Sequence, residues 1–273
     1  MSLDDVLNLL AADADADLDV AEVALLLARD EYPQLDVRAY LDQLRDLARD
    51  ARGHIGGDQA EQLAGLCRYL FHEIGLRGNA KDYYDPRNSY LSDVLDRLTG
   101  IPITLSVVTI AVGRRLGLPL IGLGLPGHFV VQCAGADPPL IVDPFHGGRS
   151  LTVDQCRALS ARIVGVDIPL SPSELAPPPL GLIVQRMLGN LRGIYLQRED
   201  WRRAARTLGR MHQLSPSDVQ VSRDLGVCLL RTQQPGRALV HLETYLRAAP
   251  DADDVSAIRD LLAAAVREVG RWN

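Results

Sequence analysis

The chain has 273 residues, of which 47% are apolar, and a formal net charge of −6. This length and apolar content allow one large domain or two smaller ones and exclude a largely disordered chain. The net charge is negative, and acidic and basic residues are scattered along the chain. This argues against nucleic acid or an anionic membrane surface as a partner. The N-terminus is acidic where a signal peptide is basic, and the longest apolar run, Ile103 to Gly113, is shorter than the ~20 residues that span a bilayer.

The four cysteines, at positions 67, 133, 156 and 228, have no C-x-x-C spacing. They match neither the usual zinc patterns nor a disulfide framework, so we expect a cytoplasmic protein with no metal or other cofactor.

The N-terminal part is predicted to be helical, because apolar residues recur there at steps of three and four. The pattern covers residues 6–27, 35–51 and 58–74, and Gly75 ends the last of these helices. Residues 83–89 have the composition of a turn, with Asp85-Pro86 and Asn88.

The middle of the chain predicts a helix followed by a small sheet. The helix begins at Gly100-Ile101-Pro102, runs through Leu116 and ends at Gly117. Short buried strands are expected at 120–125, 129–133 and 140–142, with a hairpin turn at 134–138, and another helix begins near Thr152.

The C-terminal part predicts helical repeats. Residues 168–180 contain five prolines and are interpreted as a linker. Beyond it a pattern of apolar residues, alanine and proline recurs after 34 residues, the period of tetratricopeptide repeats. Matching positions are Leu191, Tyr195, Ala204, Leu208 and Pro216 in one copy and Leu225, Leu229, Ala238, Leu242 and Pro250 in the next. A helix over 255–269 is expected to cap the stack.

A histidine and an aspartate stand out in the predicted sheet. His128 precedes one expected strand, and Asp143 follows 15 positions later at the end of another. On neighbouring antiparallel strands, the carboxylate can accept a hydrogen bond from the imidazole and orient it as a general base. A helix start, then a histidine and then an aspartate is the order of parts in a cysteine-nucleophile site, where the helix dipole and the imidazolium lower the pKa of the thiol.

The sequence around this pair resembles the SirB1-type transglutaminase-like family. The segments that carry the resemblance are Gly100-Ile101-Pro102-Ile103-Thr104-Leu105-Ser106, Arg114-Arg115-Leu116-Gly117-Leu118-Pro119-Leu120, Pro126-Gly127-His128-Phe129 and Asp143-Pro144-Phe145-x-Gly147-Gly148. The resemblance covers about residues 20 to 165. It implies an α+β fold, a transglutaminase-like (papain-like) core of helices on a small antiparallel sheet, joined here to an all-α tetratricopeptide-repeat module.

The wider superfamily uses a Cys-His-Asp triad for acyl transfer or amide hydrolysis. The resemblance assigns the base and its orienting group to His128 and Asp143, and counting back from Gly117 puts the cysteine slot at Pro102. Proline has neither a nucleophile nor an N–H to stabilise an oxyanion, so the domain is predicted to lack the catalytic cysteine.

Several residues are weaker candidates for a replacement nucleophile. Ser106 and Thr104 lie in the first turns of the same helix, with Ser106 about one turn, ~6 Å, beyond the slot. Cys67 lies on an earlier helix, and Cys133, an odd number of residues from His128, is expected on the opposite face of the strand. A metal site of His128, Asp143 and His146 is a further alternative, although its spacing is not diagnostic.

Three hypotheses for the function follow. The favoured one is a non-catalytic binding or scaffold protein that uses its repeats, around Leu191, Tyr195, Leu225 and Leu229, to bind a protein or peptide. The alternative is an unorthodox hydrolase or acyltransferase that uses His128 and Asp143. A third is an oligomerisation unit, in which the two repeats pair between copies. The expected domains are 1–167, the linker 168–180 and the repeat module 181–273.

Overall fold

The apolar helix expected at Pro102 is the centre of the N-terminal part of the molecule. In the computed structural model, which describes residues 1–14, 16–167 and 176–270, this helix is α6 (Pro102–Arg115), and it is buried from Pro102 through Gly113. Pro102 is its first residue, where a missing N–H leaves no hydrogen bond unmade. A side chain at Gly113 would come within 2.2 Å of Leu120, so the glycine allows α6 and the sheet to approach closely.

A four-stranded antiparallel sheet packs against α6. Its order is β3-β4-β5-β6, and Val131 pairs with Val142 across the central two strands. The first three strands were predicted. The fourth was not, because it is a three-residue edge strand whose first two residues are exposed. The strands are β3 (Leu120–Leu123), β4 (Val130–Cys133), β5 (Leu140–Asp143) and β6 (Arg149–Leu151).

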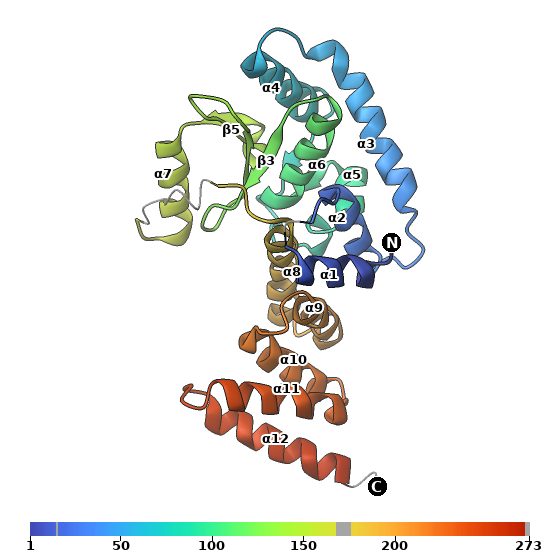
Figure 1. Cartoon of the computed structure of the whole chain (residues 1–273), viewed down its shortest axis with the longest axis vertical. Coiled ribbons are helices and arrows are strands. Elements are labelled where there is room, and N and C mark those ends of the chain that lie inside the picture. The colour runs from blue at the N-terminus through green and yellow to red at the C-terminus, as the bar shows by residue number, and fades with distance from the viewer. Residues whose placement is uncertain (15, 168–175, 271–273) are drawn as a thin grey trace. The chain divides into compact units, whose positions relative to one another are not determined.

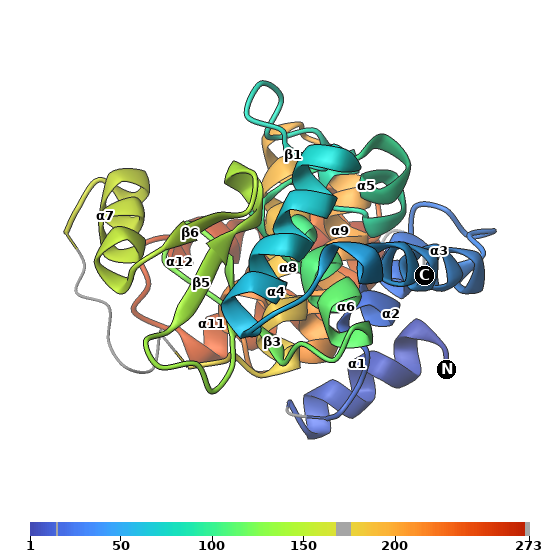
Figure 2. The same ribbon diagram turned by 90° about the horizontal axis from the view of Figure 1, so that it is seen from above.

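The sheet lies between two helices. Figures 1 and 2 show α6 on one side and α7 (Val153–Val164) on the other. Val130 and Ile141 point from the sheet toward α7 and form a buried cluster with Leu159. Thr152 caps α7 by accepting a hydrogen bond from the N–H of Gln155, as the predicted helix start near Thr152 requires.

Further helices surround α6. The helices expected at 35–51 and 58–74 are present, and an aspartate caps the start of each. The second helix continues into a π-helical segment, Arg68–Glu73. The seven-residue α5 and the parallel pair of two-residue strands β1 and β2 were not predicted. These elements are α2 (Val20–Ala28), α3 (Val37–Ala51), α4 (Gln59–Cys67), β1 (Arg77–Gly78), α5 (Leu91–Arg97) and β2 (Thr99–Gly100).

The C-terminal part consists of helices in the predicted repeat. Its second and fourth helices begin at Trp201 and Pro235, which confirms the 34-residue period. Gly226 allows α10 and α11 to pack closely, because a side chain there would come within 2.6 Å of Leu242. The helices, all labelled in Figure 1, are α8 (Leu180–Gln197), α9 (Trp201–Leu214), α10 (Val219–Arg231), α11 (Pro235–Ala248) and α12 (Val255–Gly270).

The chain forms two compact units, and the N-terminal helix α1 (Leu3–Ala12) does not group with the rest of the N-terminal part. The second unit begins at Gln185 but also contains Asp4–Ala14, which the sequence assigned to the first domain. Asp4 forms an ion pair with Arg210 of α9, and Asn8 accepts a hydrogen bond from Gln213. Most of the predicted linker, 168–175, lies outside the described residues. Within the described ranges, no helix is both long and apolar enough to cross a membrane.

Candidate functional site

His128 and Asp143 meet at one end of the sheet. Asp143 is the last residue of β5, and His128 precedes β4 by two residues, just outside the strand. The chain turns at Gly127, whose φ of +72° favours glycine. A side chain at Gly127 would also come within 2.6 Å of Ile163, so both the backbone conformation and the lack of space favour glycine at this position.

The imidazole of His128 and the carboxylate of Asp143 form a buried hydrogen-bonded pair. The distance from Nε2 to Oδ1 is 2.9 Å, and the residues are 3% and 0% exposed. Burial acts to raise the pKa of Asp143. The hydrogen bonds and charges of His128 and His146 outweigh burial and hold that pKa below its usual value. Asp143 is therefore ionised at neutral pH and fixes the orientation of the His128 ring.

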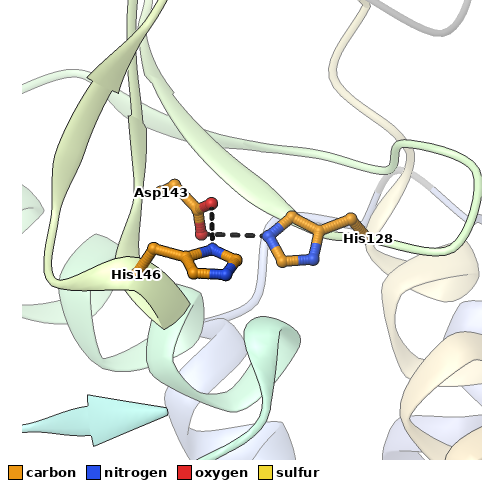
Figure 3. Close-up of side chains that lie close together, drawn as sticks. All are labelled: His128, Asp143 and His146. Carbon is orange, nitrogen blue, oxygen red and sulfur yellow. Dashed lines mark hydrogen bonds and ion pairs between the residues drawn. The ribbon is translucent and has the colours of Figure 1, made fainter. Parts of the chain in front are cut away.

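A second histidine binds the same carboxylate. His146 Nδ1 lies 2.6 Å from Asp143 Oδ2, and Figure 3 shows the carboxylate between the two rings. The 3₁₀ turn Pro144–His146 explains this contact, because side chains three residues apart are eclipsed in a 3₁₀-helix. Arg149 lies 3.5 Å from the same oxygen. From the sequence, His146 had been considered only as a weak metal ligand.

Pro102 lies in the same pocket as this pair. A cavity of about 460 Å³ is lined by Pro102, His128 and His146, together with aromatic and apolar side chains and one arginine. The helix start, the histidine and the aspartate thus converge as the resemblance implies, with proline at the helix start. Sequence reasoning missed several residues of the lining, since only the turn at 83–89 pointed to this region. They are Tyr83, Tyr84, Leu159, Arg162 and Ile163.

The two hydroxyl candidates are buried and engaged elsewhere. Ser106 donates a long hydrogen bond of 3.5 Å to the carbonyl of Phe129. Thr104 accepts a hydrogen bond from the N–H of Ile101 and donates at 2.8 Å to the carbonyl of Asn88, so it caps α6. Neither hydroxyl lines the pocket that contains Pro102 and His128. Their positions are those of structural hydroxyls.

The four cysteines are free and buried. Burial raises the pKa of Cys67 to about 12 and that of Cys133 above its usual value. Burial, with a nearby aspartate, raises the pKa of Cys156 and of Cys228 to about 11. At neutral pH these are thiols rather than thiolates, and none of them lines the pocket with Pro102.

The comparisons with known proteins agree with the two-part organisation of the fold. The profile of the transglutaminase-like superfamily matches residues 38–189, and a tetratricopeptide-repeat profile matches residues 191–263. This chain belongs to the transglutaminase-like superfamily. A UPF0162 protein of Xylella fastidiosa is 38% identical over 92% of each chain, and one of Vibrio cholerae is 26% identical over 90% of this chain and 92% of its own.

The likeness extends to a eukaryotic protein. The F-box only protein 21 of Mus musculus is 33% identical over 49% of this chain, a stretch that covers 22% of the mouse protein. No solved structure matches the chain.

The four repeat residues around which partner binding was expected are buried side chains. Leu191, Tyr195, Leu225 and Leu229 were expected to contact a partner, but they are between 1% and 5% exposed. Their spacing is that of the packed interior of a helix stack, although Leu229 also lines the groove described next. A partner would bind the outer surface instead.

That outer surface contains a groove rich in arginine. Arg202, Arg206 and Arg210 follow one another at four-residue steps on α9 and share one face of the helix. With Arg237 of α11 they line a groove of about 420 Å³ whose lining also includes the small residues Ala205 and Gly209. The ion pair of Arg210 with Asp4 shows that this surface binds a carboxylate within the chain itself.

Proposed function

We propose that this protein is a SirB1-type transglutaminase-like protein without catalytic activity, which binds a protein partner through its helical repeats. The observation that supports the loss of catalysis is Pro102 at the first position of α6, in the pocket of His128. A thiol at that position would be activated by the helix dipole and by the imidazole. Proline offers neither a nucleophile nor a backbone donor.

The alternative is an unorthodox hydrolase or acyltransferase, and one experiment distinguishes the two. Wild-type protein is incubated with a fluorophosphonate and, separately, with iodoacetamide at neutral pH, and labelled residues are identified by mass spectrometry. We expect no site whose labelling depends on His128, because the hydroxyls of Ser106 and Thr104 are buried and the thiols are protonated. Labelling that disappears in His128→Gln, with the fold intact by circular dichroism, would establish the alternative.

The arginine groove gives the proposed partner its chemistry. Arginine in a shallow groove favours carboxylates, which it binds through paired hydrogen bonds. We therefore expect an acidic segment of a protein to lie along α9 and α11. The four free and buried cysteines are consistent with the reducing cytoplasm in which we place this interaction.

The test of the groove uses a charge-reversed variant and a matched control. Arg202→Glu/Arg237→Glu changes two exposed arginines of the groove, and Arg259→Glu/Arg267→Glu makes the same charge change on α12. Proteins captured from lysate are compared quantitatively between the variants, and a polyglutamate peptide serves as a defined ligand. The proposal requires that only the groove variant loses both the captured proteins and the binding of polyglutamate. Equal loss in both variants would indicate nonspecific charge attraction.

Pairing between copies of this chain is the remaining alternative. It predicts a molar mass that is a multiple of 29.8 kDa in light scattering and that falls on dilution. A monomer at all concentrations would exclude it.

A further inference from the structure

His146 is a residue that a Cys-His-Asp arrangement does not require. Such a triad uses one histidine and one carboxylate, and His128 with Asp143 already supplies both. The structure nevertheless places a second imidazole 2.6 Å from the other oxygen of that carboxylate. The segment of the resemblance that contains this position reads Asp143-Pro144-Phe145-x-Gly147-Gly148, in which His146 is the unspecified residue. The proposed function gives this second histidine no role.

The three side chains form a potential ligand set for a metal ion. One nitrogen of His128, one oxygen of Asp143 and one nitrogen of His146 all lie within 4.8 Å of one another. Bonds from zinc to nitrogen and oxygen are about 2.0–2.2 Å long, so tetrahedral ligand atoms lie roughly 3.4 Å apart. The nitrogen–oxygen distances of 2.9 and 2.6 Å are shorter than this by less than about 1 Å. The ligand atoms of the cluster lie as much as 4.8 Å apart, about 1.4 Å more than this spacing, so the side chains must rotate to reach a common ion.

The site combines rigid and accessible ligands. Asp143 and His128 are almost fully buried, while the side chain of His146 is 38% exposed. Both histidines line the pocket of about 460 Å³, and His146 also lines a second pocket of about 440 Å³ beside Cys67. An ion can therefore enter from solvent past His146. The pocket leaves room for a water molecule as a fourth ligand, as in zinc sites with three protein ligands.

The ligand types indicate the class of ion. Two imidazoles and one carboxylate suit zinc and neighbouring divalent transition metals rather than calcium or magnesium, which prefer oxygen ligands. We propose that His128, Asp143 and His146 bind one divalent transition-metal ion, with Zn²⁺ as the first choice. The proposal is independent of partner binding by the repeats, which involves other residues of the chain.

Arg149 makes the proposal more specific. Its guanidinium is 3.5 Å from Asp143 Oδ2, and its side chain is 46% exposed. A nearby positive charge opposes the binding of a cation, because both compete for the same carboxylate. Replacing Arg149 should therefore strengthen metal binding, whereas replacing any of the three ligands should weaken it. An adventitious ion held by exposed histidines would show no such pattern.

The experiment measures Zn²⁺ affinity by competition with a fluorescent chelator, on the full chain without an affinity tag. The key variant is His146→Ala, because this half-exposed residue can be changed with little risk to the fold. His72→Ala, an exposed histidine of the same unit outside the cluster, is the matched control. We expect one Zn²⁺ per wild-type chain and at least a ~100-fold loss of affinity in His146→Ala, since even losing an outer-shell partner costs about 10–100-fold. His72→Ala should match wild type.

A second measurement keeps the result interpretable. Co²⁺ replaces Zn²⁺, because its visible absorption reports ligation by nitrogen and oxygen. This absorption should be present in wild type and absent in Asp143→Asn. Arg149→Gln should bind Zn²⁺ more tightly than wild type. The proposal is overturned if wild type binds no Zn²⁺ at micromolar concentrations, if His146→Ala binds as wild type does, or if His72→Ala loses binding equally.

Discussion

Replacing Pro102 by cysteine tests whether this position is the slot of the missing nucleophile. Pro102→Cys places a thiol at the first residue of α6, in the pocket lined by His128. The stability cost should be small. Losing a proline that fits its backbone costs about 0.4–1 kcal/mol, mainly because the unfolded chain gains freedom. A variant with serine at the same position measures this cost without adding a thiol.

The expected effect is a lowered thiol pKa. A cysteine at a helix N-terminus or beside an imidazolium has a pKa of about 3.5–7.5, against about 8.5 for a free cysteine. A shift from about 8.5 to about 6.5 corresponds to roughly 2.7 kcal/mol of thiolate stabilisation. The native cysteines give a low background, because a thiol with a pKa of about 11, as at Cys156 and Cys228, is about one part in ten thousand thiolate at pH 7.

The assay is the pH profile of iodoacetamide labelling, read by mass spectrometry at the new cysteine. The midpoint of the profile is more informative than the rate, because a thiol with a lower pKa is also a weaker nucleophile. We expect a midpoint below about 7.5 in Pro102→Cys and a return toward about 8.5 when His128→Gln is added. A midpoint near 8.5 that does not respond to His128→Gln would refute the assignment of Pro102 to the slot.

Three further predictions concern stability. Asp143 has a lowered pKa in the folded state, so its contribution to stability is present above its unfolded pKa, about 3.9, and is lost as pH falls through the folded value. In urea unfolding, the free energy of unfolding of Asp143→Asn should decline less steeply below about pH 4 than that of wild type, and parallel curves would contradict this. Gly226→Ala should cost about 1–3 kcal/mol, because the added methyl group forces α10 away from α11. In the same assay the control Gly193→Ala, whose methyl group meets open space, should be neutral or stabilise by up to about 1 kcal/mol, and equal effects would mean that the close packing is unimportant. Leu7→Ala should cost about 2–5 kcal/mol and increase hydrogen exchange in α9, because Leu7 is fully buried in a helix of the second unit. Leu9 is 40% exposed on the same helix, so Leu9→Ala should change little, and similar exchange in both variants would contradict the packing of α1.

Local patterns predicted most of the elements correctly. The start of α6 at Pro102 follows from proline chemistry, and the repeat helices follow from a period of 34 residues. What was missed is short or polar: α5 has seven residues, and β6 has three. Elements of this length carry too few residues for a periodic pattern, and their neighbours in space hold them in place.

The site was predicted in its residue types but not in its geometry. His128 and Asp143 were paired because one precedes an expected strand and the other ends a neighbouring one, and the structure places them 2.9 Å apart. The engagement of Ser106 with a backbone carbonyl on another element depends on how α6 packs on the sheet. A contact between residues 23 positions apart leaves no periodic signal in one sequence.

The sequence by itself determined the parts: a histidine, an aspartate, a proline where a thiol is expected, and a repeat of two helical pairs. The tertiary structure alone decided three other matters. It placed His146 on the same carboxylate as His128, buried the repeat leucines that had been expected to contact a partner, and grouped α1 with the C-terminal helices. Periodicity and motif spacing act along the chain, whereas these contacts depend on side chains that only packing brings together.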